Sequence, residues 1–502
     1  MIKKLDRRGF IKAMGAGIAA FCATGLLSAA EKSPETRRPN ILYIFTDDQS
    51  IRSVSCYPEA HDWVKTPNID RLASEGVRFT YAYTGAWCMP SRVTALTGLL
   101  PHGAQSLKMK VNPIATYDPE KLPFWPSVFR KNGYETACIG KWHLGEDIGH
   151  GRDWDYSVIW DRGAGNAGAY YHNTLVRTNG GERKPLGGYS TDRYTDLAVD
   201  YINGRKDSNN PWYLWLCYGG VHAPFTPAER HLDDYKEVSS VPVPEDIFPP
   251  RPTKPTYMKN YGKWKKDKDG NPVGLDKAVL KYNRAVKSLD EGVGRVIESL
   301  RETGQLDNTL IVFTSDQGYA WGQHGFKWKY APYDANLLAP LIVRLPGKVA
   351  KNKVCRHPVG GQDLIPTFFS MAGISLPWDM HGHDITPILK NPEAEWNHPV
   401  LMVNTKYYYG KDTEKEDRPG WGGVPWWVSL RKGEYKYIRT LVEGEIEELY
   451  DLEADPEELT NLALNPEHKK TLLSYRQQLL NELKRTKAGM VKNLPAVKTL
   501  GK

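Results

Sequence analysis

The chain has 502 residues and a formal net charge of +8, from 67 Lys and Arg residues against 59 Asp and Glu residues. The first 30 positions hold five of the basic residues and one acidic residue, so the remainder has 62 basic and 58 acidic residues and a net charge of +4. Such a small charge, without a basic stripe or a recognition motif, argues against nucleic-acid binding. The length predicts one large domain with a smaller appendage.

Residues 1–30 have the features of a twin-arginine export signal. The arginines at 7–8 precede an apolar segment at 13–27, and the small residues at 28–30 are suited to cleavage. The apolar segment is short and rich in glycine and alanine, so we predict no stable membrane insertion. Cys22 offers a lipid-attachment site as an alternative, although the bulky residue before it does not fit small-residue processing. We therefore expect a cleaved signal peptide, export by the twin-arginine translocase, and a periplasmic or secreted protein.

Four short apolar runs predict the central strands of a sheet, at 40–45, 135–139, 212–218 and 309–313. Such continuous runs are typical of parallel strands that are buried on both faces. Amphipathic segments between them, such as 67–73 and 280–303, predict the crossover helices that parallel strands require. We therefore predict an α/β fold with a doubly wound, mostly parallel sheet and a site at the carboxyl ends of its strands.

Carboxylates follow two of these strands at the point where each strand ends. Asp47 and Asp48 come after the first run, and Asp316 and Gln317 come after the last. We expect these side chains to converge, and three carboxylates would repel one another unless they share a cation. Oxygen ligands without histidine favour calcium or magnesium, and we expect one calcium ion. Taken singly, each pair would be a common turn cap, which is the alternative interpretation.

Cys88 is predicted to begin a helix. Pro90 fits the first helical turn, and Val93, Leu96 and Leu100 recur at helical spacing. Cys88 therefore faces the unpaired N–H groups of that turn, which favour negative charge. A cysteine at such a place is more often inert packing. The reactive residues at the neighbouring strand ends favour a nucleophile instead.

Residues 88–92 match the C-x-P-S-R signature of the sulfatase family, and the chain resembles that family over nearly its whole length after the leader. The blocks G-K-W-H-L-G at 140–145 and H-x-P-F at 222–225 extend the resemblance. It implies an alkaline phosphatase-like fold and oxidation of Cys88 to formylglycine by a formylglycine-generating maturation enzyme. The resemblance assigns the metal ligands to Asp47, Asp48, Cys88, Asp316 and Gln317. The glutamine departs from the asparagine or histidine that is usual at its position.

The resemblance also implies how the residues share the chemistry of sulfate ester hydrolysis. The hydrated aldehyde, a gem-diol, attacks sulfur after losing a proton toward Asp316. His222, with Lys329, protonates the leaving alcohol, and His143 is the base that regenerates the aldehyde. The implied catalytic set is Cys88, Arg92, Lys141, His143, His222, Asp316 and Lys329. Lys327 remains an alternative to Lys329, because it lies close in the same loop.

A different pattern begins after about residue 395. Alternating residues and glycine turns within 429–452 predict a small antiparallel sheet, and 467–485 predict a closing helix. We therefore predict a catalytic domain at 38–395 and a C-terminal α+β subdomain at 396–490. The aromatic residues of 407–427 either pack between the subdomains or form a wall for stacking sugars, and the sequence favours neither.

Together these features predict an exported sulfatase that depends on calcium and formylglycine and acts on sulfated carbohydrate or polysaccharide fragments. One alternative is a phosphonate monoester or phosphodiester hydrolase of the same superfamily. Another is a non-catalytic protein that binds sulfated glycans, in which Cys88 would remain a thiol.

Overall fold

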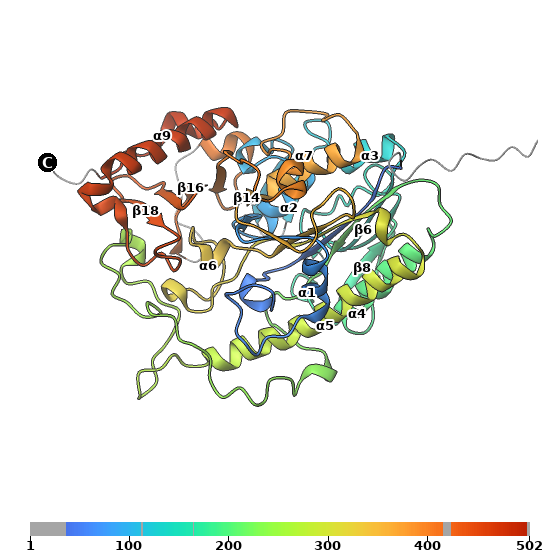
Figure 1. The fold of residues 1–502 in the computed structure, drawn as a ribbon, viewed down its shortest axis with the longest axis horizontal. Coiled ribbons are helices and arrows are strands. Elements are labelled where there is room, and N and C mark those ends of the chain that lie inside the picture. The colour runs from blue at the N-terminus through green and yellow to red at the C-terminus, as the bar shows by residue number, and fades with distance from the viewer. Residues whose placement is uncertain (1–36, 112–113, 164, 415–422, 499–502) are drawn as a thin grey trace, which may run out of the picture. The chain divides into compact units, whose positions relative to one another are not determined.

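The computed structural model describes residues 37–111, 114–163, 165–414 and 423–498, and the predicted signal peptide lies outside them. Residues Arg38–Lys502 form one compact unit. Its centre is a ten-stranded sheet with the order β13-β2-β12-β11-β1-β10-β6-β7-β8-β9 (Figure 1). The strands are β1 (Asn40–Thr46), β2 (Val77–Phe79), β6 (Glu135–Lys141), β7 (Tyr156–Trp160), β8 (Leu175–Thr178), β9 (Arg183–Pro185), β10 (Trp212–Cys217), β11 (Thr309–Ser315), β12 (Leu341–Arg344) and β13 (Lys353–Cys355).

The five central strands, β11, β1, β10, β6 and β7, are all parallel, which confirms the predicted sheet. Every residue of β1, β10 and β11 is buried, as their continuous apolar sequences predict. The sheet is mixed only toward its edges, where β12 runs antiparallel to both β11 and β2. Because the central strands are parallel, their carboxyl ends lie along one edge.

Helices cover both faces of the sheet, which explains why its strands are apolar on both sides. Figure 1 shows α1, α4 and α5 on one side and α2, α3 and α7 on the other. Their bounds are α1 (Pro67–Ser74), α2 (Cys88–Thr97), α3 (Pro126–Lys131), α4 (Ser190–Asn203), α5 (Leu275–Glu302) and α7 (Gly361–Ala372). The helix predicted at 280–303 thus begins one turn and a half earlier, at Leu275.

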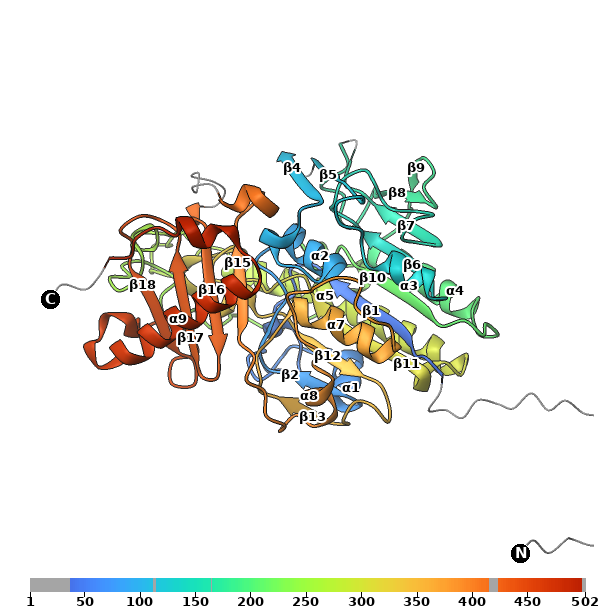
Figure 2. The ribbon, with the colours of Figure 1, turned by 90° about the horizontal axis from the view of Figure 1, so that it is seen from above.

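A four-stranded antiparallel sheet forms the C-terminal part, as predicted, and we call it the C-terminal sheet (Figure 2). Its elements are β15 (Val400–Asn404), β16 (Trp427–Lys432), β17 (Tyr435–Thr440) and β18 (Glu447–Asp451), and α9 (Lys469–Arg485) packs on it. One face of this sheet and α9 enclose a second hydrophobic core, which includes Val428, Leu430 and Leu479. Trp427 and Tyr450 belong instead to the main core, so the other face packs on the larger part of the protein, where Trp427 meets Tyr330 and Tyr450 meets Tyr333.

The aromatic segment at 407–427 is mainly packed within the protein where the structure describes it. Tyr409, Trp426 and Trp427 are buried. Tyr407 is only half-buried, and its ring centroid lies 5.5 Å from that of Trp87, the residue before Cys88. Packing within the two hydrophobic cores therefore accounts for most of these rings.

The remaining short strands and α-helices connect these layers. They are β3 (Ala82–Tyr83), β4 (Leu107–Val111), β5 (Ile114–Tyr117), β14 (Val359–Gly360), α6 (Asp334–Leu337) and α8 (Thr386–Lys390). Among the described residues, none of the helices combines the length and apolar character needed to cross a membrane.

Candidate active site

The polar residues after the central strands meet in one buried site, as the parallel topology predicts. The loop after β1 is tied to both neighbouring strand ends. Asp47 N–H donates to the carbonyl of Gly220, after β10, at 3.0 Å. Asp316 N–H, after β11, donates to the carbonyl of Thr46 at 3.1 Å. These bonds fix the strand ends on which the site is built.

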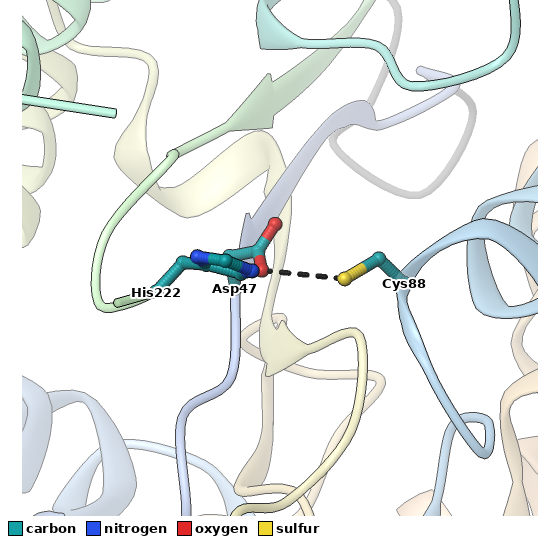
Figure 3. Close-up of side chains that lie close together, drawn as sticks. All are labelled: Asp47, Cys88 and His222. Carbon is teal, nitrogen blue, oxygen red and sulfur yellow. Dashed lines mark hydrogen bonds between the residues drawn. The ribbon is translucent and has the colours of Figure 1, made fainter. Parts of the chain in front are cut away.

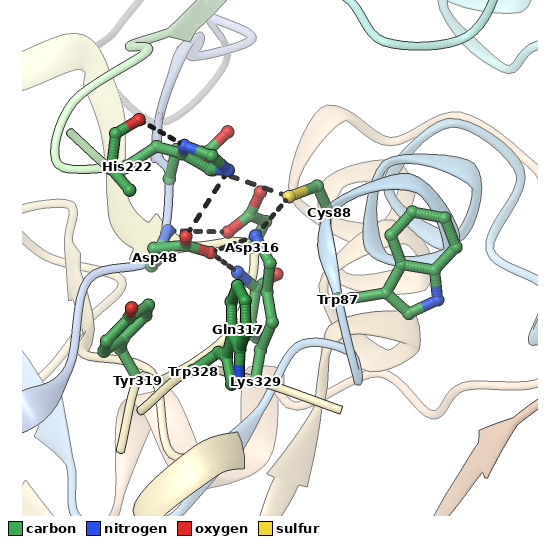
Figure 4. Close-up of polar contacts among 12 residues, drawn as sticks. Asp48, Trp87, Cys88, His222, Asp316, Gln317, Tyr319, Trp328 and Lys329 are labelled. Atoms are coloured by element: carbon green, nitrogen blue, oxygen red, sulfur yellow. Dashed lines mark hydrogen bonds and ion pairs between the residues drawn. The ribbon is translucent and has the colours of Figure 1, made fainter. Parts of the chain in front are cut away.

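Cys88 begins α2 and points into this site. Its Sγ lies 3.5 Å from Asp47 Oδ1 (Figure 3) and 3.0 Å from Lys329 Nζ (Figure 4). The preceding residue, Trp87, is extended, so the helix starts where the sequence predicted. The chain packs tightly here, since a Cβ on Gly85 would lie 1.8 Å from Ser91 Oγ. Cys88 is thus held at the centre of the charged side chains.

Arg92 lies one turn after Cys88 and joins the helix to three strand ends. Its Nη2 is 3.0 Å from Asp47 Oδ2 and 3.4 Å from Asp316 Oδ2, and its Nη1 donates to the carbonyl of Lys141 at 2.7 Å. The Lys141 ammonium also pairs with Asp47. All four side chains are fully buried. Buried charges require such pairing, because each would otherwise lose its hydration without compensation.

Asp48, Asp316 and Gln317 cluster around the same point (Figure 4), and Asp47 belongs to the same cluster. Ligand atoms of Asp47, Asp48, Cys88 and Asp316 all lie within 4.8 Å of one another. Asp48 N–H donates to Asp316 Oδ1 at 3.0 Å, and Gln317 Nε2 donates to Asp48. Gln317 Oε1 is buried and has no hydrogen-bond partner. An oxygen in that state is suited to a cation.

The carboxylates strongly perturb one another. Burial, and then repulsion by Asp47, raise the pKa of Asp316 to about 7. Burial also raises the pKa of Asp48, against the opposing charge of Lys329. Burial acts in the same direction on Asp47, but Lys141, His222 and Arg92 together hold the pKa of Asp47 well below its usual value. Two of the three carboxylates thus have raised pKa values despite the nearby cationic side chains, and a cation bound among them would favour their charged forms.

Lys329, rather than Lys327, reaches the site. Lys329 Nζ donates to Asp48 Oδ1 at 2.6 Å. Burial opposes its charge, but Asp48 and Cys88 raise the pKa of Lys329 well above its usual value, so it remains an ammonium. Lys327 instead places its Nζ 4.9 Å from the ring centroid of Trp264. The structure therefore places Lys329, and not Lys327, beside Cys88.

His222 lies at the edge of the cluster. Its Nδ1 is 2.7 Å from the carbonyl of Ala223, and because a carbonyl only accepts, Nδ1 carries the proton. Its Nε2 then faces the site, 3.6 Å from Asp48 Oδ2. The ring stacks on Tyr170 with centroids 3.9 Å apart. Burial and the charge of Lys329 lower the pKa of His222 well below its usual value.

His143 is bound by a residue that the sequence did not single out, Arg162. Arg162 Nη1 lies 2.6 Å from His143 Nε2. A guanidinium only donates, so Nε2 accepts and the imidazole is neutral. Burial and then Arg162 lower the pKa of His143 well below its usual value. Arg162 follows β7, another strand end, and that position was the one signal that could have identified it.

The chain matches known protein families over most of its length. A family model described as Sulfatase matches residues 39–374, and one described as N-sulphoglucosamine sulphohydrolase, C-terminal, matches residues 322–486. The chain is 29% identical over 521 residues to an N-acetylglucosamine-6-O-sulfatase of Bacteroides thetaiotaomicron, covering 92% of this chain and 89% of the relative. It is 26% identical over 456 residues to an ulvan-active sulfatase of Formosa agariphila, covering 88% and 80%.

Solved structures share the fold. One that holds its substrate, D-glucosamine-2-N,6-O-disulfate, has a TM-score of 0.77 at 26% identity, covering 90% of this chain and 98% of that chain. The phosphonate monoester hydrolase of Agrobacterium radiobacter has a TM-score of 0.65 at 21% identity, covering 89% and 96%. At that identity, the second likeness shows the fold alone.

Proposed function

This chain belongs to the sulfatase family and is a sulfuric ester hydrolase, and we propose that it removes sulfate from carbohydrates through a formylglycine made from Cys88. The observation that carries the proposal is the place of Cys88 Sγ, 3.0 Å from Lys329 Nζ and 3.5 Å from Asp47 Oδ1. A group at this position lies among both the cations and the carboxylates that sulfate transfer needs. Formylglycine would supply, as its hydrate, the hydroxyl nucleophile at residue 88.

A calcium ion fits the oxygen cluster. We propose that Asp47, Asp48, Asp316 and Gln317 hold it beside residue 88. The fit rests on the buried amide oxygen of Gln317, which has no hydrogen-bond partner, and on the closely spaced carboxylates. All of these donors are hard oxygens, which calcium prefers. The ion would supply positive charge to the sulfate oxygens and to the carboxylates.

The charges of the site balance without a cation and become positive with one. Three carboxylates, of Asp47, Asp48 and Asp316, face three cationic side chains. The cationic side chains are those of Arg92, Lys141 and Lys329. A divalent cation would make the site positive, and the ammonium groups of Lys141 and Lys329 could then turn toward an anionic substrate. Arg92 would remain on the carboxylates, because its guanidinium is also fixed to the carbonyl of Lys141.

The leaving alcohol requires a proton, and two groups are placed to deliver it. Lys329 Nζ is an ammonium that contacts Cys88 Sγ. His222 Nε2 faces the site because its Nδ1–H is fixed by the carbonyl of Ala223. The lowered pKa of His222 makes its protonated form a strong acid. We propose that these two groups protonate the leaving oxygen.

His143 would act as the base in the second half of the reaction only after its Nε2 leaves Arg162. Because Arg162 donates to that nitrogen, the imidazole is already neutral, as a base must be. We therefore propose that Arg162 keeps His143 deprotonated between turnovers and that a bound substrate displaces the contact.

The carbohydrate substrate is proposed from the relatives. The named relatives are an N-acetylglucosamine-6-O-sulfatase and an ulvan-active sulfatase, and a similar solved structure holds D-glucosamine-2-N,6-O-disulfate. We propose a sulfated sugar as substrate, with a 6-O-sulfated glucosamine as the first compound to test. The features of residues 1–30 support export to the periplasm or beyond by the twin-arginine route.

Two measurements test this function. Peptide mass spectrometry across 87–92, on protein produced with a formylglycine-generating enzyme, should show an aldehyde at residue 88. The same protein should release sulfate from N-acetylglucosamine 6-sulfate faster than it cleaves a phosphonate monoester, and Cys88→Ala should do neither. A persistent thiol at residue 88 would refute the mechanism, and faster cleavage of the phosphonate would refute the proposed sulfated-glucosamine substrate.

A further inference from the structure

The residue after the active-site lysine has an unusual backbone conformation. Tyr330 has a φ of +85°, in the left-handed region that residues with side chains rarely occupy. Such a conformation persists only where surrounding contacts determine it. The preceding residue, Lys329, places its ammonium on Asp48 and Cys88. The contacts of Tyr330 therefore control where this ammonium lies.

Both backbone groups of Tyr330 have fixed partners. Its N–H donates to the carbonyl of Ala86 at 3.2 Å, just before Cys88. Its carbonyl accepts from Asn404 Nδ2 at 3.0 Å and from Trp427 Nε1 at 2.7 Å. Both donor residues are buried, since Asn404 is 1% exposed and Trp427 is 0% exposed, whereas Tyr330 itself is partly buried. The C-terminal sheet thus binds the carbonyl of Tyr330, and the segment that leads to Cys88 binds its N–H.

The two donors come from one position of the C-terminal sheet. Asn404 on β15 and Trp427 on β16 are direct partners in the antiparallel register. Side chains of directly opposed residues project from the same face of a sheet. That face belongs to the main core, whereas Trp426 and Val428 on either side of Trp427 belong to the second core. One cross-strand pair therefore donates to one carbonyl, that of Tyr330, in the loop at 329–334 that carries Lys329.

The same sheet also holds the far end of the loop. Asp334 begins α6, and its Oδ1 accepts from Lys436 Nζ at 2.6 Å. Lys436 lies on β17 and is buried. Tyr83 OH adds contacts of 3.1 Å to both carboxylate oxygens. Residues 330–334 are therefore fixed at both ends by β15, β16 and β17.

We propose that Asn404 and Trp427 are positioning residues for Lys329, through their shared hydrogen bonds to the Tyr330 carbonyl. The inference rests on the proposed contact of Lys329 with the sulfate group. Without the two donors, the left-handed conformation of Tyr330 loses its support and the ammonium moves away from residue 88. A displacement of about 1 Å is enough to cost about a hundredfold in rate. The C-terminal sheet is then part of the active site, although it supplies no group that touches the reacting atoms.

Binding of inorganic sulfate tests the proposal without turnover. The full chain is produced with Cys88 as a thiol, saturated with calcium, and titrated with sulfate by calorimetry. Lys329→Ala should weaken sulfate binding, and Trp427→Phe and Asn404→Ala should each weaken it about tenfold, the usual cost of losing a residue that orients another. In the Lys329→Ala background, Trp427→Phe should cause no further loss, because the group it positions is absent.

Trp426→Phe is the matched control for folding. It shortens the neighbouring buried tryptophan, which packs with Tyr408 in the second core. It should lower the melting temperature about as much as Trp427→Phe but leave sulfate binding unchanged. Equal sulfate affinity in Trp427→Phe and the parent, or a loss that adds fully to that of Lys329→Ala, would overturn the proposal. Failure of the proposed function gives another result, in which Lys329→Ala itself binds sulfate like the parent and both inferences fall.

Discussion

Replacing Gln317 by methionine tests whether its amide oxygen holds the cation. Methionine keeps the length of the side chain and removes both polar atoms. Without calcium, the change removes the hydrogen bond from Gln317 Nε2 to Asp48, which is worth about 1.5–3 kcal/mol because the acceptor is charged. It also removes a buried oxygen without a partner, which costs about 1–3 kcal/mol. The two effects nearly cancel, so the free energy of unfolding should change by less than about 1 kcal/mol.

With calcium the two proteins should differ. At a calcium concentration of about 100 times its Kd, the parent gains about 2.7 kcal/mol. Loss of the ligand contributed by Gln317 should weaken binding at least as much as loss of an outer-shell partner, which costs about ten- to a hundredfold. The variant would then gain only about 0.4–1.4 kcal/mol at the same calcium concentration.

Urea unfolding in EDTA and at a series of calcium concentrations measures both quantities. Gln362→Met is the matched control, because Gln362 on α7 also has a buried Oε1 without a partner. Its Nε2 donates to the carbonyl of Leu401. The control should gain as much from calcium as the parent does. An equal gain in Gln317→Met would show that the amide is not a ligand, and no gain in the parent would refute the calcium site.

Three further predictions concern buried charge. Burial lowers the pKa of His102 to about 4, from about 6.5 in the unfolded chain. Between pH 6.5 and pH 4 only the unfolded state takes up the proton, so the free energy of unfolding falls as the pH falls. Between pH 7 and pH 4, the free energy of unfolding of His102→Phe should therefore fall by about 3 kcal/mol less than that of the parent, as measured by urea unfolding. Equal losses in both proteins would contradict this. Lys436→Met breaks a buried ion-pair cluster and should destabilise the protein by about 3–5 kcal/mol. The control Lys432→Met, at the partly exposed end of the same hairpin, should change the free energy of unfolding by less than about 0.5 kcal/mol. Similar urea midpoints for the two variants would contradict the importance of the cluster. Arg162→Met should raise the pKa of His143 in an NMR titration, because it removes the nearest positive charge, and an unchanged pKa would disprove the contact.

The sequence by itself predicted the sheet and much of the site, because the physical causes are local. Continuous apolar runs can be buried only between two layers of helices, so 40–45 and 309–313 were identified as central strands. Parallel strands end on one edge, so Asp47 and Asp316 had to meet. The helix that begins at Cys88 was readable from its proline and its apolar spacing.

Tertiary structure decided the contacts that join segments far apart in the chain. Lys329 and Lys327 have the same chemistry, and only the packing of their loop shows which one reaches Cys88. The aromatic segment looked equally suited to binding sugar or to packing, and Trp427 proved to be buried. Its bond to the Tyr330 carbonyl spans 97 residues of sequence. No local pattern encodes such a bond, because it depends on how the C-terminal sheet packs on the rest of the protein, and that packing is set by the two hydrophobic cores together.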